Sequence, residues 1–223
     1  MRRHLEQSLH NLRSDYVDLY YLHQVNEDVP LENIAGVMGK LIQEGIIRAW
    51  GLSQVSAEML RRADQVTPVS AVQNIYSMVE RICEADIFPY CIEHGIGVVP
   101  FSPIASGLLS GKVPRDTKFE GDDVRKFVPQ LAEENLEANQ PILDVVCQYA
   151  TVKGATNAQI ALAWMLHKYP NVVPIPGSKN KERILKNLRA SEVKLTEDEF
   201  SSLEQALNAC TVYGHRGHVE TEQ

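Results

Sequence analysis

Asp15-Tyr-Val-Asp-Leu-Tyr-Tyr-Leu-His23 is the most informative segment of this sequence, because it is rich in residues that favour strands and ends on a polar side chain. In a barrel of parallel strands, catalytic groups stand at the carboxyl ends of the strands, which is where His23 would lie. Residues 1–14 are all that precede this stretch. The sequence therefore reads as the back part of a catalytic barrel, and we expect the front part to be absent from this chain.

Apolar segments and helical patterns alternate along the rest of the chain. We expect strands at residues 16–22, 46–52, 69–75, 97–101 and 172–175. We expect helices at residues 1–13, 30–44, 56–64, 85–93, 131–152, 157–167, 181–188 and 196–208, two of which begin at clear capping signals. Such alternation predicts an α/β fold with a parallel sheet. Five βα units with a leading helix fit the last five units of a (β/α)8 barrel.

Residues 1–223 are expected to form a single, partial barrel domain followed by a flexible tail, residues 210–223. Residues 102–130 are polar and too long for a plain connection, so we interpret them as a functional loop. An unclosed parallel sheet has two unpaired edges, through which the chain could self-associate. No Gly-x-Gly-x-x-Gly follows any expected strand, which gives no support to a Rossmann site.

Composition excludes several classes of protein. The 223 residues are 44% hydrophobic and 23% charged, which is typical of a soluble globular protein, and the net charge of −7 argues against a nucleic-acid partner. No apolar run is long enough for a membrane span, and the first residues do not resemble a secretory signal. The four cysteines form no Cys-x-x-Cys pair, which favours a reduced, cytoplasmic setting. His215 and His218 have no neighbouring ligand cluster in the sequence, so we expect no metal site.

The segments after the five expected strands are specific in combination. They are Leu22-His-Gln24, Gly51-Leu-Ser-Gln-Val55, Val72-Gln-Asn-Ile-Tyr-Ser77, Val99-Pro-Phe-Ser-Pro-Ile-Ala-Ser-Gly-Leu-Leu-Ser-Gly-Lys112, and Val173-Pro-Ile-Pro-Gly-Ser-Lys179 with Arg183 and Asn187. This ordered set closely resembles the aldo-keto reductases, which are NADP(H)-dependent barrel oxidoreductases. The resemblance covers about residues 1–208 and implies the reduction of aldehydes and ketones to alcohols.

The resemblance implies a catalytic role for His23, which would orient the carbonyl oxygen of the substrate by hydrogen bonding. Reduction of a carbonyl builds negative charge on that oxygen, so a nearby donor is needed. The alternative for this histidine is a structural position at the end of a strand. In the same family, residues matching Ser53, Gln54 and Gln73 bind the nicotinamide carboxamide, whose donors and acceptor such side chains complement. The family usually has Asn where this chain has Gln54.

Phe101 stands where the family stacks an aromatic ring on the nicotinamide, although an ordinary core phenylalanine is the alternative. The loop after it would then wrap the pyrophosphate, where small residues allow a close approach of the backbone. The residues implied for this loop are Ser102, Pro103, Ile104, Ala105 and Ser106, with Lys112 supplying charge.

A cluster of cations follows the fifth expected strand in an otherwise acidic chain. Arginine and lysine suit the 2′-phosphate that distinguishes NADP(H) from NAD(H). The resemblance assigns the adenosine 2′-phosphate and the adenine to Gly177, Ser178, Lys179, Arg183 and Asn187. The alternative is a solvated helix face, which is what most charge runs are.

The family uses a catalytic tetrad of Asp, Tyr, Lys and His, and this sequence has no Asp-x-Ala-x-x-Tyr-Gly segment to supply the first two. Three explanations compete. The sequence could be a fragment of an active reductase, which we favour. It could instead exist as written and complete its sheet by pairing with a partner, as a non-catalytic NADP(H)-binding, subunit-like or structural protein. Alternatively, an unrelated chain could supply the missing units. The sequence does not name the carbonyl substrate.

Overall fold

The computed structural model describes residues 1–26 and 28–216. These residues form two compact units. The first consists of residues 1–74 and 84–98, and the second of residues 75–83 together with the residues from 99 onward. Each unit is described by itself.

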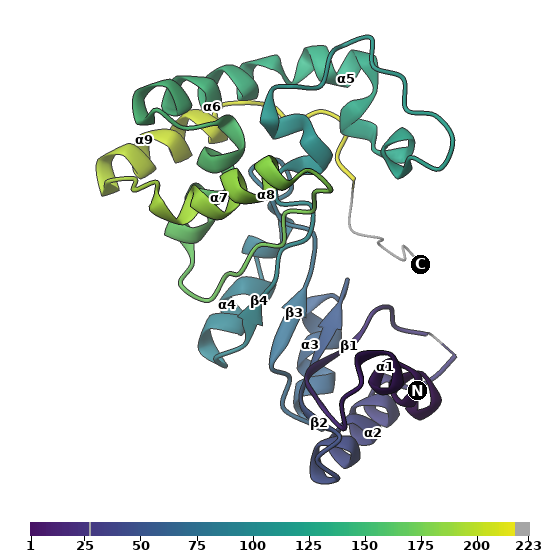
Figure 1. Cartoon of the computed structure of the whole chain (residues 1–223). Coiled ribbons are helices and arrows are strands. Elements are labelled where there is room, and N and C mark those ends of the chain that lie inside the picture. The colour runs from purple at the N-terminus through teal and green to yellow at the C-terminus, as the bar shows by residue number, and fades with distance from the viewer. Residues whose placement is uncertain (27, 217–223) are drawn as a thin grey trace. The chain divides into compact units, whose positions relative to one another are not determined.

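The first unit contains a parallel sheet with the strand order β1-β2-β3-β4, whose neighbouring ribbons are visible in Figure 1. The strands are β1 (Val17–Leu22), β2 (Ile47–Ser53), β3 (Ala71–Gln73) and β4 (Gly97–Val98). The connecting helices are α1 (Arg2–Leu12), α2 (Leu31–Gln43), α3 (Ala57–Asp64) and α4 (Ile87–Glu93). The alternation of parallel strands with helices, predicted from the sequence, is therefore present in this unit.

Helices of the first unit begin and end where the sequence predicts. Pro30 is the N-cap of α2, and the helix ends two residues before Gly45, which adopts a φ of 74°. The Ser56 hydroxyl accepts a hydrogen bond from the backbone N–H of Met59 at the start of α3. Helix α2 buries one apolar stripe against the sheet, formed by Leu31, Ile34, Ala35, Met38 and Leu41.

Strand β2 lies at the centre of this unit's core. Trp50 is fully buried, and its indole N–H donates to the backbone oxygen of Pro68 at 2.9 Å, so its polar atom is satisfied. The next residue, Gly51, leaves room for the ring of Tyr21 on β1, because a Cβ at Gly51 would lie 2.5 Å from a ring carbon. The strand therefore requires both a large ring and an absent side chain at adjacent positions.

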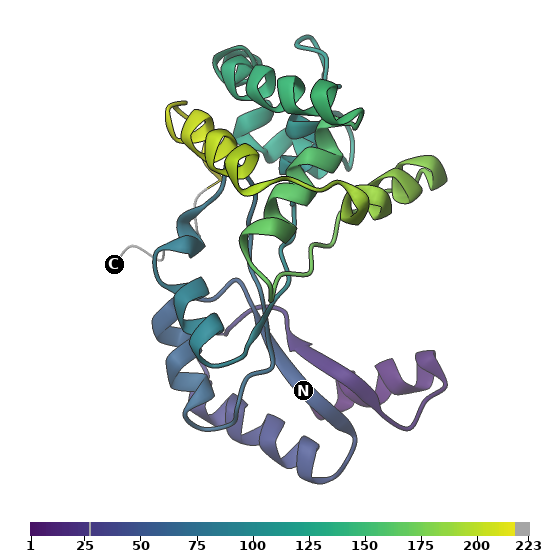
Figure 2. The ribbon, with the colours of Figure 1, turned by 90° about the vertical axis from the view of Figure 1, so that its left-hand side faces the viewer.

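The second unit is mainly helical. Its helices are α5 (Glu133–Ala138), α6 (Gln140–Lys153), α7 (Asn157–Lys168), α8 (Lys181–Leu188) and α9 (Glu197–Asn208). Short 3-10 turns lie at Ala105–Ser110, Val124–Phe127, Pro129–Leu131 and Arg189–Glu192, and a further one at Ile82–Glu84 spans the boundary between the units. Helix α6 packs against α7, and α6 lies beside α9 in both views (Figures 1 and 2).

The core of the second unit centres on Trp164 of α7, whose ring is fully buried and stacks on Tyr76 with ring centroids 5.6 Å apart. The carboxylate of Glu204 on α9 accepts hydrogen bonds from the Trp164 indole N–H and from Lys168 Nζ, and pairs with Arg81 at 2.8 Å. The predicted capping box at the start of α9 is confirmed, with reciprocal bonds between Thr196 and Glu199.

Four expected elements differ in the structure. The single helix expected over residues 131–152 is two helices, α5 and α6. Asn139 lies between them and bonds to the backbone of Tyr213, and Pro141 stands in the first turn of α6, where a proline is tolerated. No strand forms over residues 172–175. The prolines Pro174 and Pro176 lack N–H donors, and Ile175 N–H makes a single backbone hydrogen bond, 3.1 Å, to the oxygen of Pro100. Strands β3 and β4 are also shorter than expected.

Candidate functional site

The register of the sheet in the first unit brings three predicted residues to one carboxyl edge. Leu22 pairs with Leu52, and Ser53 pairs with Gln73. His23 and Ser53 each follow directly after the paired leucines, so His23, Ser53 and Gln73 end three neighbouring strands at the same level. His23 is exposed, whereas Ser53 is only 3% exposed. This edge therefore presents an imidazole, a hydroxyl and a carboxamide together.

The turn after β2 holds an unusual backbone conformation at Gln54, whose φ of 54° is rare for a residue with a side chain. The Gln54 N–H donates to the backbone oxygen of Gln73 at 3.1 Å. The side chain of the buried Asn74 holds Val55, the residue after Gln54. Its Oδ1 accepts from Val55 N–H at 3.2 Å, and its Nδ2 donates to Val55 O at 2.8 Å. Asn74 therefore fixes the turn that carries Ser53 and Gln54, a role that the sequence motif contained but did not reveal.

Tyr21 is a further polar group of this unit, two residues before His23 on the same side of β1. Its hydroxyl oxygen is buried and has no hydrogen-bond partner among residues 1–26 and 28–216. Burial raises the pKa of Tyr21, so the hydroxyl stays protonated well above neutral pH. Nothing in the spacing of the sequence pointed to this residue.

The loop after Phe101 in the second unit is held in a strained form. Ser102, Ala105 and Ser106 have φ values of 52°, 46° and 54°, and Gly107 has a φ of 106°. Gln54, Ser102, Ala105 and Ser106 are four of the five non-glycine residues with positive φ in the described part of the chain. All four belong to the residues expected to bind the cofactor. Strain of this kind persists where the surrounding structure enforces it, and it concentrates at ligand sites.

A second segment of the same unit lies beside this loop. The hydrogen bond from Ile175 N–H to Pro100 O joins the two segments just before Phe101 and Gly177. Asn180 caps α8 by accepting the N–H of Arg183 at 3.0 Å, and Ser178 Oγ accepts the N–H of Asn180 at 3.1 Å. The loop expected to hold the pyrophosphate and the segment expected to hold the 2′-phosphate are thus neighbours.

The charges around the start of α8 fit an anionic group. Lys179 and Arg183 are exposed, and neither forms an ion pair among the residues that the structure describes. By contrast, Arg48 and Arg62 are held by surface carboxylates at 2.7 Å. Unpaired cations beside the N-terminus of a helix favour a bound anion such as phosphate.

The remaining expected residues have plainer surroundings. Phe101 is half-buried, and its backbone pairs with that of Ile75 in an isolated bridge. Pro103 is buried beneath the loop, Lys112 is exposed, and Asn187 is half-buried in the last turn of α8. No group of three or more side chains suited to a metal ion occurs in the described ranges, and His218 lies outside them. Within the same ranges, no helix is both long and apolar enough to cross a membrane.

Comparison with known proteins gives consistent results. The model of the Aldo/keto reductase family matches residues 1–208. The thermostable aldo-keto reductase Tm1743, solved with the inhibitor epalrestat, is 30% identical with a TM-score of 0.72, and the match covers 92% of this chain and 65% of that one. The glycerol dehydrogenase AKR11B4 from Gluconobacter oxydans is 30% identical with a TM-score of 0.82, over 92% of this chain and 63% of its own.

This chain therefore spans slightly less than two thirds of the length of either solved structure. The likeness confirms the expected (β/α)8-barrel class, because both the family model and the structural matches extend over most of the chain.

Proposed function

We propose that this chain, which belongs to the aldo/keto reductase family, is an oxidoreductase that uses NADPH to reduce aldehydes and ketones to alcohols. The observation that supports this best is the coincidence of backbone strain with the expected cofactor residues. Four of the five strained non-glycine residues of the described chain are Gln54, Ser102, Ala105 and Ser106. The fifth is Arg13, at the end of α1. Strain concentrated in one set of residues supports a ligand that this set binds.

Each part of the dinucleotide has residues of suitable chemistry. The hydroxyl of Ser53 and the amides of Gln54 and Gln73 would bind the nicotinamide carboxamide. Phe101 would stack on the nicotinamide ring. The loop of residues 102–106, with Lys112, would bind the pyrophosphate. The 2′-phosphate and the adenine would be bound by Gly177, Ser178, Lys179, Arg183 and Asn187. The unpaired cations near α8 are the reason to prefer NADP(H) to NAD(H).

His23 would donate a hydrogen bond to the carbonyl oxygen of the substrate and so stabilise the negative charge that develops there. Its place at the carboxyl end of β1, exposed beside Ser53, suits that task. Bound NADPH would supply the hydride. The 223 residues contain no Asp-x-Ala-x-x-Tyr-Gly segment, which in this family carries the tyrosine that donates the proton.

The cofactor assignment is tested with Arg183→Ala, which removes a cation next to the expected 2′-phosphate. NADPH affinity should fall roughly tenfold or more, and NADH affinity should change little, because only NADPH has that phosphate. Arg62→Ala is the matched control, since it removes the same charge from a surface pair with Glu32. Equal weakening of both cofactors would remove Arg183 from the 2′-phosphate.

A second candidate function is cofactor binding without catalysis, favoured by the missing tyrosine segment. NADPH oxidation at 340 nm with a reactive aromatic aldehyde separates the two functions. Loss of general acid catalysis alone lowers the rate about 10²- to 10⁴-fold, so we expect weak turnover from these 223 residues. Saturable NADPH binding with no turnover at all would favour the binding function, and rapid turnover would show that the chain has another proton donor.

A further inference from the structure

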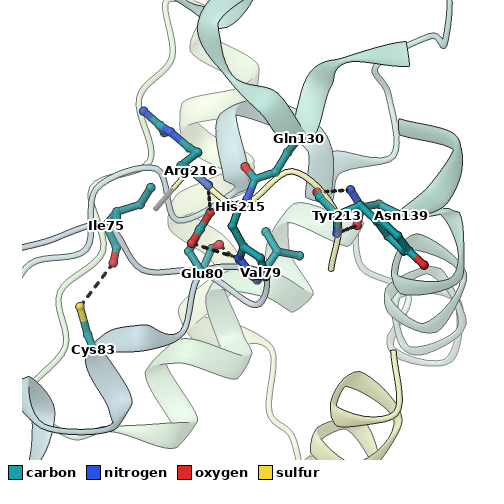
Figure 3. Close-up of polar contacts among 10 residues, drawn as sticks. Ile75, Val79, Glu80, Cys83, Gln130, Asn139, Tyr213, His215 and Arg216 are labelled. Atoms are coloured by element: carbon teal, nitrogen blue, oxygen red, sulfur yellow. Dashed lines mark hydrogen bonds and ion pairs between the residues drawn. The ribbon is translucent and has the colours of Figure 1, made fainter. Parts of the chain in front are cut away.

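Residues 210–216 follow α9 and run along the second unit. We call this segment the C-terminal strap. Asn139, which is fully buried, holds it by a reciprocal pair of bonds. The Tyr213 N–H donates to Asn139 Oδ1 at 3.0 Å, and Asn139 Nδ2 donates to Tyr213 O at 2.9 Å (Figure 3). The Asn139 side chain thus satisfies both backbone polar groups of Tyr213, as a neighbouring strand would.

A second buried side chain holds the end of the strap. Glu80 is only 4% exposed, and its Oε1 accepts hydrogen bonds from the backbone N–H of Arg216 and, at 2.7 Å, from Gln130 Nε2 (Figure 3). The ring Nδ1 of His215 lies 3.5 Å from the other carboxylate oxygen. A buried carboxylate is costly unless it is hydrogen-bonded, so these partners fix where Arg216 lies.

Gly214 makes this path possible. It has a φ of 73°, and a Cβ there would lie 2.6 Å from Asn135 Nδ2 and 2.7 Å from the backbone of Pro129. A side chain at this position would therefore push the strap away from the unit. The buried side chains of Asn139 and Glu80, together with Gly214, therefore hold the strap in one specific conformation.

The strap places a cation on the strained loop. Arg216 Nη1 donates to Ser102 Oγ at 2.8 Å and lies 3.5 Å from Ser106 Oγ. Its guanidinium carbon is 6.0 Å from the centroid of the Phe101 ring. Within the described residues the guanidinium has no carboxylate partner, so its charge is not neutralised. An unneutralised arginine held against two hydroxyls suits a phosphate, which accepts hydrogen bonds from both kinds of group.

We propose that Arg216 is a further cofactor-binding residue, which contacts the diphosphate of the dinucleotide from the C-terminal strap, and that Glu80 is the residue that positions it. This inference rests on the proposed function, because the Ser102–Ser106 loop is assigned to the diphosphate there. The structure adds a binding residue from a segment that lies 114 residues beyond Ser102 in the chain.

The test is a binding titration of the full chain with NADPH and with adenosine 2′-monophosphate, which has the 2′-phosphate but no phosphate at the 5′ position. Arg216→Ala should weaken NADPH binding roughly 10- to 100-fold, because it removes a charged hydrogen bond to phosphate. Binding of adenosine 2′-monophosphate should be nearly unchanged. Arg216→Lys should recover part of the NADPH affinity, since it restores the charge without the planar fork.

Gly214→Ala is the second variant, because it dislodges the strap and leaves Arg216 intact. It should reproduce most of the loss of NADPH affinity while the far-UV circular dichroism stays that of the wild type. Arg62→Ala, the control for charge, should bind NADPH as the wild type does.

The outcomes separate the inference from the function on which it rests. If the wild type binds NADPH and Arg216→Ala binds it equally well or more tightly, the inference fails and the proposed function stands; tighter binding would mean that Arg216 blocks the loop. If Arg216→Ala lowers the affinity for both ligands equally, Arg216 does not contact the diphosphate. If the folded wild type does not bind NADPH, the proposed function itself fails.

Discussion

The ring of Tyr21 on β1 lies against the backbone of Gly51 on the neighbouring strand β2. A Cβ at Gly51 would come within 2.5 Å of a Tyr21 ring carbon and 2.7 Å of the backbone oxygen of Ala71. Neither neighbour can move away easily, because Ala71 O belongs to the next strand and the tyrosine hydroxyl is buried. This contact fixes the spacing of the strands whose ends carry His23 and Ser53.

Gly51→Ala should therefore lower the free energy of unfolding by about 2 kcal/mol or more, because overpacking forces a shift of the strands. Urea unfolding followed by circular dichroism measures this change. Gly36→Ala on helix α2 is the matched control, since nothing lies within 4 Å of the added Cβ. That change should stabilise the chain by about 0.5–1 kcal/mol. Equal effects of the two substitutions would contradict the packing described for Gly51.

Glu80→Ala should lower the stability of the second unit by about 1–3 kcal/mol, because Gln130 Nε2 and the Arg216 N–H would lose their buried acceptor. The urea midpoint reports this loss. Glu133→Ala removes an exposed carboxylate of α5 and should have an effect of at most about 0.5 kcal/mol. A Glu80 variant as stable as the Glu133 variant would show that the carboxylate does not anchor the strap.

Tyr90 should make stability depend on pH in the alkaline range. Burial, together with the hydrogen bond to Asp64 at 2.8 Å, raises the pKa of Tyr90 to about 12. An unfolded tyrosine loses its proton near pH 10, so the contribution of this group is complete below pH 10 and is lost as the pH rises to about 12.

Tyr90→Phe should therefore be less stable than the wild type at pH 8, by about 1 kcal/mol, and the difference should shrink towards pH 12. Unfolding in urea at pH 8 and pH 11.5 provides the comparison. Tyr16→Phe, whose hydroxyl has no hydrogen bond in the described chain, should show no such trend. A constant difference at both pH values would mean that the Tyr90 pKa is not raised.

Glu204→Gln should destabilise the second unit at neutral pH by about 1–3 kcal/mol, since Lys168 and Arg81 would lose the charge that they share. Burial opposes ionisation of Glu204, but the hydrogen bonds from Lys168 and Trp164 outweigh it and lower the pKa. Because the folded pKa is lowered, the stabilisation is present above about pH 4.3 and is lost as the pH falls further.

The difference between wild type and Glu204→Gln should accordingly vanish in acid, which thermal unfolding between pH 7 and pH 2 measures. Glu197→Gln on the same helix, whose side chain is 88% exposed, is the control and should stay close to the wild type throughout. A pH-independent deficit would show that the carboxylate acts through its shape rather than its charge.

The sequence predicts an element well where the reason is local. Helix α3 begins at a capping serine and α9 at a capping box, and both are confirmed. It predicts poorly where the reason is tertiary. At the break between α5 and α6, Asn139 bonds to the backbone of Tyr213, 74 residues away, although Pro141 in the first turn of α6 is also a local signal. The expected strand at residues 172–175 fails for a local reason, because Pro174 within it and Pro176 after it cannot donate to a ladder.

The candidate site shows the same division. Residues in strand-end motifs, such as His23, Ser53 and Gln73, could be selected from the sequence, and the register of the sheet aligns them. Their roles in binding stay predictions. Arg216 and Glu80 could not be selected, because 136 residues separate them and the strap has no periodic pattern. Only the folded chain shows that a buried carboxylate and a distant backbone N–H meet.

Whether this chain binds NADP(H) can be measured by titrating the folded wild-type chain with NADPH and following energy transfer from tryptophan to the bound nicotinamide. We expect saturable binding of one NADPH per chain, competition by NADP⁺, and clearly weaker binding of NADH. A chain that keeps its circular dichroism but shows no saturable signal with NADPH, or that binds NADH equally well, would contradict this expectation.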